Sequence, residues 1–335
     1  MKDLYKSCRL CPRGCGVNRL AGEKGFCGET AALRIAAAVI HKGEEPPITG
    51  TGGSGAVFIS GCNLGCSFCQ NYQISHNDNM RRAQRNPQSA GREVSPGEFA
   101  AICAALRGKG AENINIVTGS HAVPGIIEGI TAARENKVLL PVLWNSSGYD
   151  SIEALELLSG YVDIFLPDLK TLDSKIAEKY FNAPDYPDRA KAAILKMIDI
   201  TRQKQHSALN QYTGVSKVIV RHLVLPGCLD STRSVLRWFA DNAKDRAMFS
   251  LMTQYTPVLN KKTETAKNFY SNEKQIPDRF LSAKEFETVL NWLDEFEIED
   301  GFCQELITGS DWLPDFNRTN PFSSELSVPV WSWKD

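Results

Sequence analysis

The run Ala56-Val57-Phe58-Ile59-Ser60-Gly61 passes directly into Cys62-Asn63-Leu64-Gly65-Cys66-Ser67-Phe68-Cys69. The apolar half predicts a buried strand, and the glycines predict a tight loop at its end. Cysteine thiolates are the usual protein ligands of iron–sulfur clusters. Three thiolates leave one iron of a [4Fe–4S] cube without a protein donor, and an open position is what separates a reactive metal centre from a sealed one. The stretch therefore predicts a reactive cluster at the end of a strand.

Apolar runs and segments of helical spacing alternate along the chain around this motif. The candidate strands are residues 57–61, 113–118, 138–145, 162–168, 217–226 and 248–256. The candidate helices are residues 96–107, 123–135, 151–158, 189–202, 231–243 and 283–296. Six β–α units in series predict a parallel sheet with right-handed crossovers. A closed barrel has eight such units, so we expect an α/β fold with a partial (β/α)6 TIM-like barrel, and a doubly wound sheet is the alternative.

The chain divides into three parts by composition. We expect a Cys-rich metal-binding extension and connector at 1–50, a barrel at 51–300, and a C-terminal tail or lid at 301–335, irregular after Ile307. In either sheet architecture, chemistry is expected at the C-terminal ends of the strands.

The overall charge excludes some partners. Lys and Arg number 38 against 39 Asp and Glu, so electrostatics favours neither nucleic acid nor an anionic membrane. No apolar stretch approaches the about 20 residues of a membrane span, and Met1–Lys6 lacks the apolar core of a signal peptide. We therefore expect a cytoplasmic protein, whose cysteines in a reducing compartment serve as ligands or catalysts.

A second cysteine group precedes the first. Cys8, Cys11, Cys15 and Cys27 offer four thiolates, a full tetrahedral complement. Zinc and a second [4Fe–4S] cluster both fit this number, and uncoordinated thiols are the third possibility. Cys103 lies in a predicted helix among apolar residues and is expected in the core.

The spacing of Cys62, Cys66 and Cys69, with Phe68 at the aromatic position, resembles the radical S-adenosylmethionine (SAM) signature. Further segments resemble the pyruvate formate-lyase activating enzyme-like proteins, namely residues 8–19, 43–48, 145–149, 168–170, 221–227 and 250–255. The resemblance implies that the open iron chelates SAM. One electron then cleaves SAM to methionine and a 5′-deoxyadenosyl radical, which abstracts hydrogen. It also implies a flavodoxin- or ferredoxin-like electron donor.

The resemblance assigns SAM contacts to the ends of the later strands. Asp168 and Lys170, two apart, share one face of a strand, and the lysine is expected to neutralise the SAM carboxylate. Thr118 and Gly119 occupy the place of a Gly-Gly-Glu motif from which this sequence departs. The other expected cofactor contacts are Phe68, Asn145, Ser146, Arg221, Gln254 and Tyr255. Because Arg221 and His222 face opposite sides of a strand, Arg221 is the candidate for the barrel interior.

The substrate class stays open at this point. A protein substrate of the glycyl radical enzyme type is slightly favoured over a small molecule. Two further classes are an iron–sulfur electron carrier without enzymatic activity, and a zinc-ribbon interaction module on an inactive barrel. A carrier needs neither the Asp168/Lys170 pair nor six strands, which argues against it.

Overall fold

Six parallel strands form the centre of the computed structural model, which describes residues 1–75, 90–203, 217–258 and 277–335. Four lie side by side in one sheet in the order β2-β4-β5-β6, and β7 and β8 form a second parallel pair. Their bounds are β2 Ser54–Ile59, β4 Ile114–Val117, β5 Val142–Ser146, β6 Ile164–Pro167, β7 Ile219–Leu223 and β8 Met248–Met252. All six predicted strands are confirmed.

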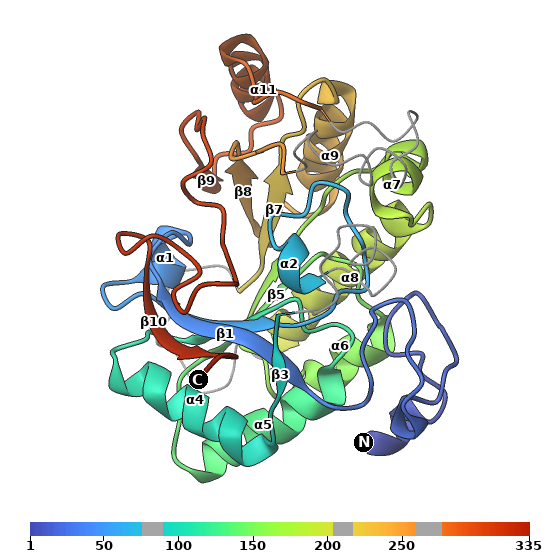
Figure 1. Ribbon diagram of the computed structural model, residues 1–335. Helices are drawn as coiled ribbons and strands as arrows, with labels where there is room; N and C mark the ends of the chain where they lie inside the picture. The colour runs from blue at the N-terminus through green and yellow to red at the C-terminus, as the bar shows by residue number, and fades with distance from the viewer. Residues whose placement is uncertain (76–89, 204–216, 259–276) are drawn as a thin grey trace, which may run out of the picture.

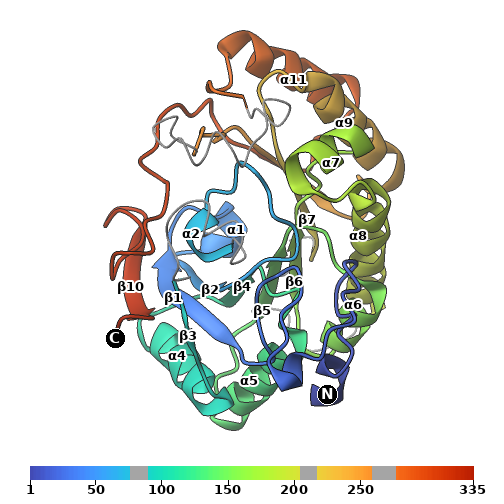
Figure 2. The same cartoon turned by 45° about the vertical axis from the view of Figure 1, so that its right-hand side comes forward.

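Isolated bridges connect the two sheets. Phe165 pairs with Val218 and Asp168 with Arg221, both in parallel. Pro167 has no N–H to donate and ends β6, which interrupts the ladder between β6 and β7. The strands thus curve through a partial TIM-like barrel that does not close, as expected (Figures 1 and 2).

Helices cover the outer face of the strands (Figure 2). The six predicted helices are present as α4 Pro96–Gly108, α5 Val123–Glu135, α6 Ile152–Leu158, α8 Tyr186–Gln203, α9 Leu229–Asn242 and α11 Ala283–Glu295. Ser95 and Glu98 form a capping box at the start of α4, which satisfies two N–H groups that the helix leaves open. The structure adds α7 (Ser174–Phe181), capped by Asp173, and the short elements η1 Lys2–Tyr5, η2 Arg19–Ala21, α1 Pro46–Thr49 and α2 Tyr72–Ser75.

Both ends of the chain contribute strands that the sequence did not predict. β1 (Arg34–His41) pairs antiparallel with β2, and β10 (Ser327–Ser332) pairs with β1. β3 (Arg92–Glu93) also pairs with β1, and β9 (Gly301–Cys303) extends β8. The extension at 1–50 thus contains one sheet strand, β1, and the expected tail or lid at 301–335 contains two, β9 and β10.

The chain between β9 and β10 joins the two outer edges of the sheets. The Thr253 hydroxyl donates 2.5 Å to the Glu305 carbonyl, and that of Thr256 donates 3.0 Å to the Gly309 carbonyl. Farther along, Asp315 accepts a hydrogen bond of 3.0 Å from Gln73 of α2. This segment crosses the open side of the barrel near the C-terminal ends of β8 and β2 (Figure 1). No helix among the described residues has the length and apolar character of a membrane span.

Candidate functional site

The three cysteines of the first motif lie in the loop that leaves β2. Gly61 and Gly65 take φ values of 84° and 62°, a region that glycine enters without a Cβ clash. The loop folds back on itself there, with Cys66 buried and Cys62 and Cys69 half-buried. The motif therefore stands at the C-terminal end of a barrel strand, as predicted.

Hydrogen-bond donors face these sulfurs. The backbone N–H of Leu64 lies 3.3 Å from Cys62 Sγ, and the Ser75 hydroxyl lies 3.1 Å from Cys69 Sγ. Burial, with the neighbouring Cys69, raises the pKa of Cys62 to about 12. Burial also raises the pKa of Cys66, and the charge of Lys170 offsets part of this rise. Without a metal the three thiols are therefore protonated, and a metal centre is what makes them thiolates.

The loop also contains polar atoms without partners. Ser67 Oγ and Asn63 Oδ1 are buried and have no hydrogen-bond partner among the described residues. As they stand, no three His, Cys, Asp or Glu side chains of the described chain are arranged to hold one metal ion. In a cubane each thiolate binds a different iron, so a cluster does not need the close convergence of a single-ion site. Three thiols with sulfur-directed donors and unpartnered polar atoms beside them fit a [4Fe–4S] cluster.

Asp168 and Lys170 form an ion pair at the end of β6. Lys170 Nζ lies 2.5 Å from Asp168 Oδ2, and the two side chains are only 16% and 20% exposed. Burial opposes the charge on Lys170, but Asp168 and Cys66 outweigh it and hold the lysine pKa above its ordinary value. Tyr186 supports the turn, since its hydroxyl accepts from the Lys170 N–H and lies 2.9 Å from the Asp168 carbonyl. The two side chains share one face, as the spacing predicted.

Thr118 has a left-handed backbone at the end of β4. Its φ is 64°, which is unfavourable for a β-branched residue and costs about 1–3 kcal/mol. The neighbouring Gly119 has a packing role, because a Cβ there would lie 2.6 Å from the Trp144 ring and 2.7 Å from Ile126. Strain of this kind concentrates at functional sites, so Thr118 is the stronger of these two candidates.

A buried carboxylate that the sequence did not single out organises the end of β5. Asp150 accepts hydrogen bonds from the hydroxyls of Ser146 (2.5 Å) and Ser120 (2.6 Å) and from the Trp144 indole (3.3 Å). The hydroxyl of Ser146, which was predicted to contact SAM, is thus already hydrogen-bonded to Asp150. Asn145 is half-buried, and its side-chain amide has no partner among the described residues. Of these two predicted contacts, only Asn145 retains a side chain available to a ligand.

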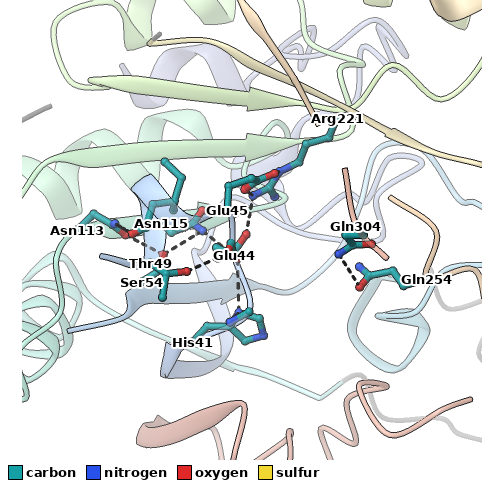
Figure 3. Close-up of polar contacts among 12 residues, drawn as sticks. His41, Glu44, Glu45, Thr49, Ser54, Asn113, Asn115, Arg221, Gln254 and Gln304 are labelled. Carbon is teal, nitrogen blue, oxygen red and sulfur yellow. Dashed lines mark hydrogen bonds and ion pairs between the residues drawn. The ribbon is translucent and has the colours of Figure 1, made fainter. Parts of the chain in front are cut away.

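Arg221 points into the barrel interior, as predicted, but towards carboxylates (Figure 3). Its Nε donates 2.9 Å to Glu45 Oε1, and an Nη contacts Glu44 Oε2 at 2.5 Å. Glu44 also accepts 3.2 Å from Asn115, at the start of β4. The predicted SAM contact of Arg221 therefore competes with a buried ion pair that the sequence analysis missed. The signal was present as two adjacent acidic residues before Pro46.

The remaining predicted contacts lie beside the cluster loop. Phe68 packs against Phe181 and Tyr255 at centroid distances of 5.7 and 5.8 Å, and the Tyr255 hydroxyl donates to the Pro277 carbonyl. Their rings are thus used in packing. The Gln254 carbonyl accepts 2.9 Å from Gln70, the residue after Cys69. Gln254 Oε1 accepts a hydrogen bond of 3.2 Å from Gln304 (Figure 3). Gln254 therefore lies beside the cluster loop.

His222 is a structural residue. It is buried, with Nδ1 2.6 Å from the Leu169 carbonyl and Nε2 3.0 Å from the Thr232 hydroxyl. Both ring nitrogens are therefore used to hold β7 against its neighbours.

Comparison with known proteins agrees with this site. Residues 56–215 match the family model of the Radical SAM superfamily. This stretch, just under half of the chain, is similar to a radical SAM domain. Such a domain implies a [4Fe–4S] cluster and SAM, and the matched range contains the cluster loop and the ends of β2, β4, β5 and β6. The closer relationship to pyruvate formate-lyase activating enzymes stays a prediction.

The chain is also similar to whole proteins. The "Uncharacterized protein MJ0674" of Methanocaldococcus jannaschii is 28% identical over 302 residues, 89% of this chain and 77% of that protein. Streptococcus suis SuiB, solved with S-adenosylmethionine, gives a TM-score of 0.44 at 14% identity, over 73% of this chain and 48% of SuiB. Methylornithine synthase (PylB) gives 0.41 at 15% identity, over 80% and 72%. The chain thus spans about half the length of SuiB.

Proposed function

We propose that this chain is a radical SAM enzyme that abstracts hydrogen from its substrate at the C-terminal mouth of the partial barrel. Cys62, Cys66 and Cys69 hold the cluster in this proposal. The observation that carries it is the Lys170–Asp168 pair, a nearly buried ion pair near enough to Cys66 for the cation to act on that thiol. A merely structural surface pair has no need of this position.

Cys62, Cys66 and Cys69 would hold a [4Fe–4S] cluster, which when bound would supply the electron for reductive cleavage of SAM and so the radical chemistry of the site. Lys170 attracts the SAM carboxylate, and its low exposure keeps the attraction strong because water screens it little. Asp168 fixes the position of the ammonium group through the 2.5 Å contact. Thr118 follows the last residue of β4 and lies beside Asn145, near the end of β5. Their polar groups contact the rest of SAM in this proposal.

The segment between β9 and β10 bears on the substrate. It is held across the open side of the barrel by Thr253, Thr256 and Gln73. An extended peptide loop entering from this side would have to displace it. This favours a small molecule over the glycyl radical enzyme type of substrate that the sequence slightly favoured. We also propose a cytoplasmic location for the chain and a flavodoxin- or ferredoxin-like electron donor.

The activity is tested by anaerobic reconstitution with iron and sulfide, followed by reduction with dithionite in the presence of SAM. We expect 5′-deoxyadenosine and methionine in equal amounts from the parent protein and from Cys303→Ser, an exposed cysteine outside both groups. Cys66→Ala should form neither. A parent protein with a full cluster that leaves SAM intact would overturn the proposal.

The substrate class is tested by dividing a cell extract by ultrafiltration. The low-mass filtrate should increase 5′-deoxyadenosine formation above the uncoupled rate, and the retained protein should not. The reverse result would assign a protein substrate.

A further inference from the structure

The four N-terminal cysteines converge although they span twenty residues of sequence. Together they line one cavity of about 10 Å³, whose wall also includes Arg19 and His121: Cys8, Cys11, Cys15 and Cys27. The close fit includes Gly25, where a Cβ would lie 2.9 Å from Cys15 Sγ. None of these cysteines belongs to the loop that follows β2.

N–H donors face the sulfurs of this group. The backbone N–H of Phe26 lies 3.4 Å from Cys15 Sγ, and an Arg19 Nη lies 3.7 Å from Cys8 Sγ. Hydrogen bonds of this kind stabilise thiolates, and around metal centres they orient the ligands.

Arg19 supplies an independent indication of negative charge. Its side chain is 2% exposed, yet it has no carboxylate partner within the described ranges. Its nitrogens contact the carbonyls of Thr30 and His121 and the sulfur of Cys8, and its guanidinium lies 4.5 Å from the Tyr5 ring centroid. A buried cation needs a counter-charge, and the cysteine sulfurs are the groups that provide one.

His121 adds an unpartnered electron pair to the cavity wall. Its Nε2 lies 2.8 Å from the Ser60 carbonyl, so this nitrogen carries the proton. Nδ1 is then an acceptor, and it is buried without a hydrogen-bond partner in the described part of the chain. The residue is 2% exposed. A buried acceptor without a partner indicates that a further group occupies the cavity beside it.

The arrangement of the sulfurs favours a cluster over a single metal ion. Among the described residues, no three His, Cys, Asp or Glu side chains are arranged to hold one ion, as a tetrahedral zinc would require. In a [4Fe–4S] cluster each thiolate binds a different iron, so the four sulfurs need not meet at one point.

The cavity adjoins the first cysteine group. A Cβ on Gly61 would lie 3.1 Å from the Cys27 carbonyl oxygen and 3.0 Å from His121 Nε2. We propose that Cys8, Cys11, Cys15 and Cys27 bind a second [4Fe–4S] cluster, with His121 at its edge, directly against the Gly61–Cys62 turn. This site is independent of the proposed function, since it concerns binding alone.

The test uses the full chain with the triple substitution Cys62/Cys66/Cys69→Ala, reconstituted anaerobically with iron, sulfide and zinc present together. We expect about four iron and four sulfide per chain, and an EPR signal after reduction by dithionite. About one zinc without iron would overturn the proposal, and so would a folded protein that binds neither metal.

A single substitution guards against misfolding of the triple variant. Cys15 is the exposed member of the group, so Cys15→Ser in the otherwise unchanged protein should lower the iron content by about half while Cys303→Ser leaves it unchanged. Equal iron in the Cys15→Ser, Cys303→Ser and parent proteins would contradict the second cluster. This experiment measures iron content and does not depend on SAM cleavage. A chain that does not cleave SAM would therefore still give a valid test of the second cluster.

Discussion

Arg13 Nε donates a hydrogen bond of 2.8 Å to the carbonyl oxygen of Asn63, which lies between Cys62 and Cys66. The same guanidinium reaches the carbonyls of Phe181 and Asn182, at the end of α7. Its Cζ lies 3.7 Å from the Phe26 ring centroid. One side chain thus joins the N-terminal cysteine segment, the loop after β2 and α7.

Arg13→Ala should lower the free energy of unfolding by about 1–3 kcal/mol, because it leaves backbone carbonyls without their charged donor. The measurement is chemical denaturation of the anaerobic protein, with the rate of cluster loss in air as a second readout. Arg9→Ala, at an exposed position, is the control. Equal stability and equal cluster lifetime in the two variants would show that Arg13 does not hold the loop.

Lys170→Met should weaken SAM binding at least about tenfold, equivalent to about 1.4 kcal/mol, with the iron content unchanged. The reason is the loss of the buried cation near Cys66. Equilibrium binding of SAM to the oxidised protein measures the effect without turnover. Lys175→Met, at an exposed position of α7, is the matched control, and equal affinity in both would remove Lys170 from the SAM site.

Thr118→Gly should leave the melting temperature unchanged or raise it, since it relieves the φ of 64° at the cost of about 0.5–1 kcal/mol of glycine entropy. Thr118→Val keeps the shape and strain and removes the hydroxyl, so it should weaken SAM binding alone. Thermal unfolding and SAM titration of the two variants separate these effects. A clear loss of stability in Thr118→Gly would mean that the Thr118 side chain itself stabilises the fold.

Arg221→Met should destabilise the protein by about 3–5 kcal/mol, because it leaves Glu44 and Glu45 as uncompensated buried carboxylates. Arg233→Met breaks an exposed pair with Glu295 and should cost less than about 1 kcal/mol. Urea denaturation of both variants at one pH gives the comparison. Similar losses in the two would show that the interior pair is well screened by water.

Stability should fall as the pH drops from about 6.5 towards 4, in part through His222. Burial, opposed by its bond to the Leu169 carbonyl, lowers the pKa of this histidine from 6.5 to about 4. Lys170 and Asp168 act on it in opposite directions. Between these two pH values the histidine is protonated in the unfolded chain but not in the folded chain. The free energy of unfolding therefore decreases by up to about 1.4 kcal/mol for each unit by which the pH is lowered.

The pH prediction is checked by denaturation at several pH values in the parent protein and in His222→Gln. The variant should show a shallower dependence over this range. An unchanged slope would assign the pH effect to other groups.

Elements that depend on local interactions could be predicted from the sequence, and elements that depend on long-range contacts could not. All six parallel strands and six helices were predicted, because continuous apolar runs and capping residues such as Ser95 are local signals. β1 was missed because its sequence, Arg34-Ile35-Ala36-Ala37-Ala38-Val39-Ile40-His41, is rich in alanine, which favours strands poorly. It is a strand because β2, β3 and β10 pair with it and Phe316 packs against the same apolar cluster.

The sequence by itself determined the reactive loop, the parallel β–α order and the Asp168/Lys170 face. Each of these depends on residues within a few positions of one another, where spacing alone fixes geometry. Only the tertiary structure decided that Arg221 meets Glu44 and Glu45, that Asp150 engages Ser146, and that His121 lies between the two cysteine groups. These contacts join distant segments, and their burial, which makes a charge or a lone pair consequential, arises only when the chain is folded.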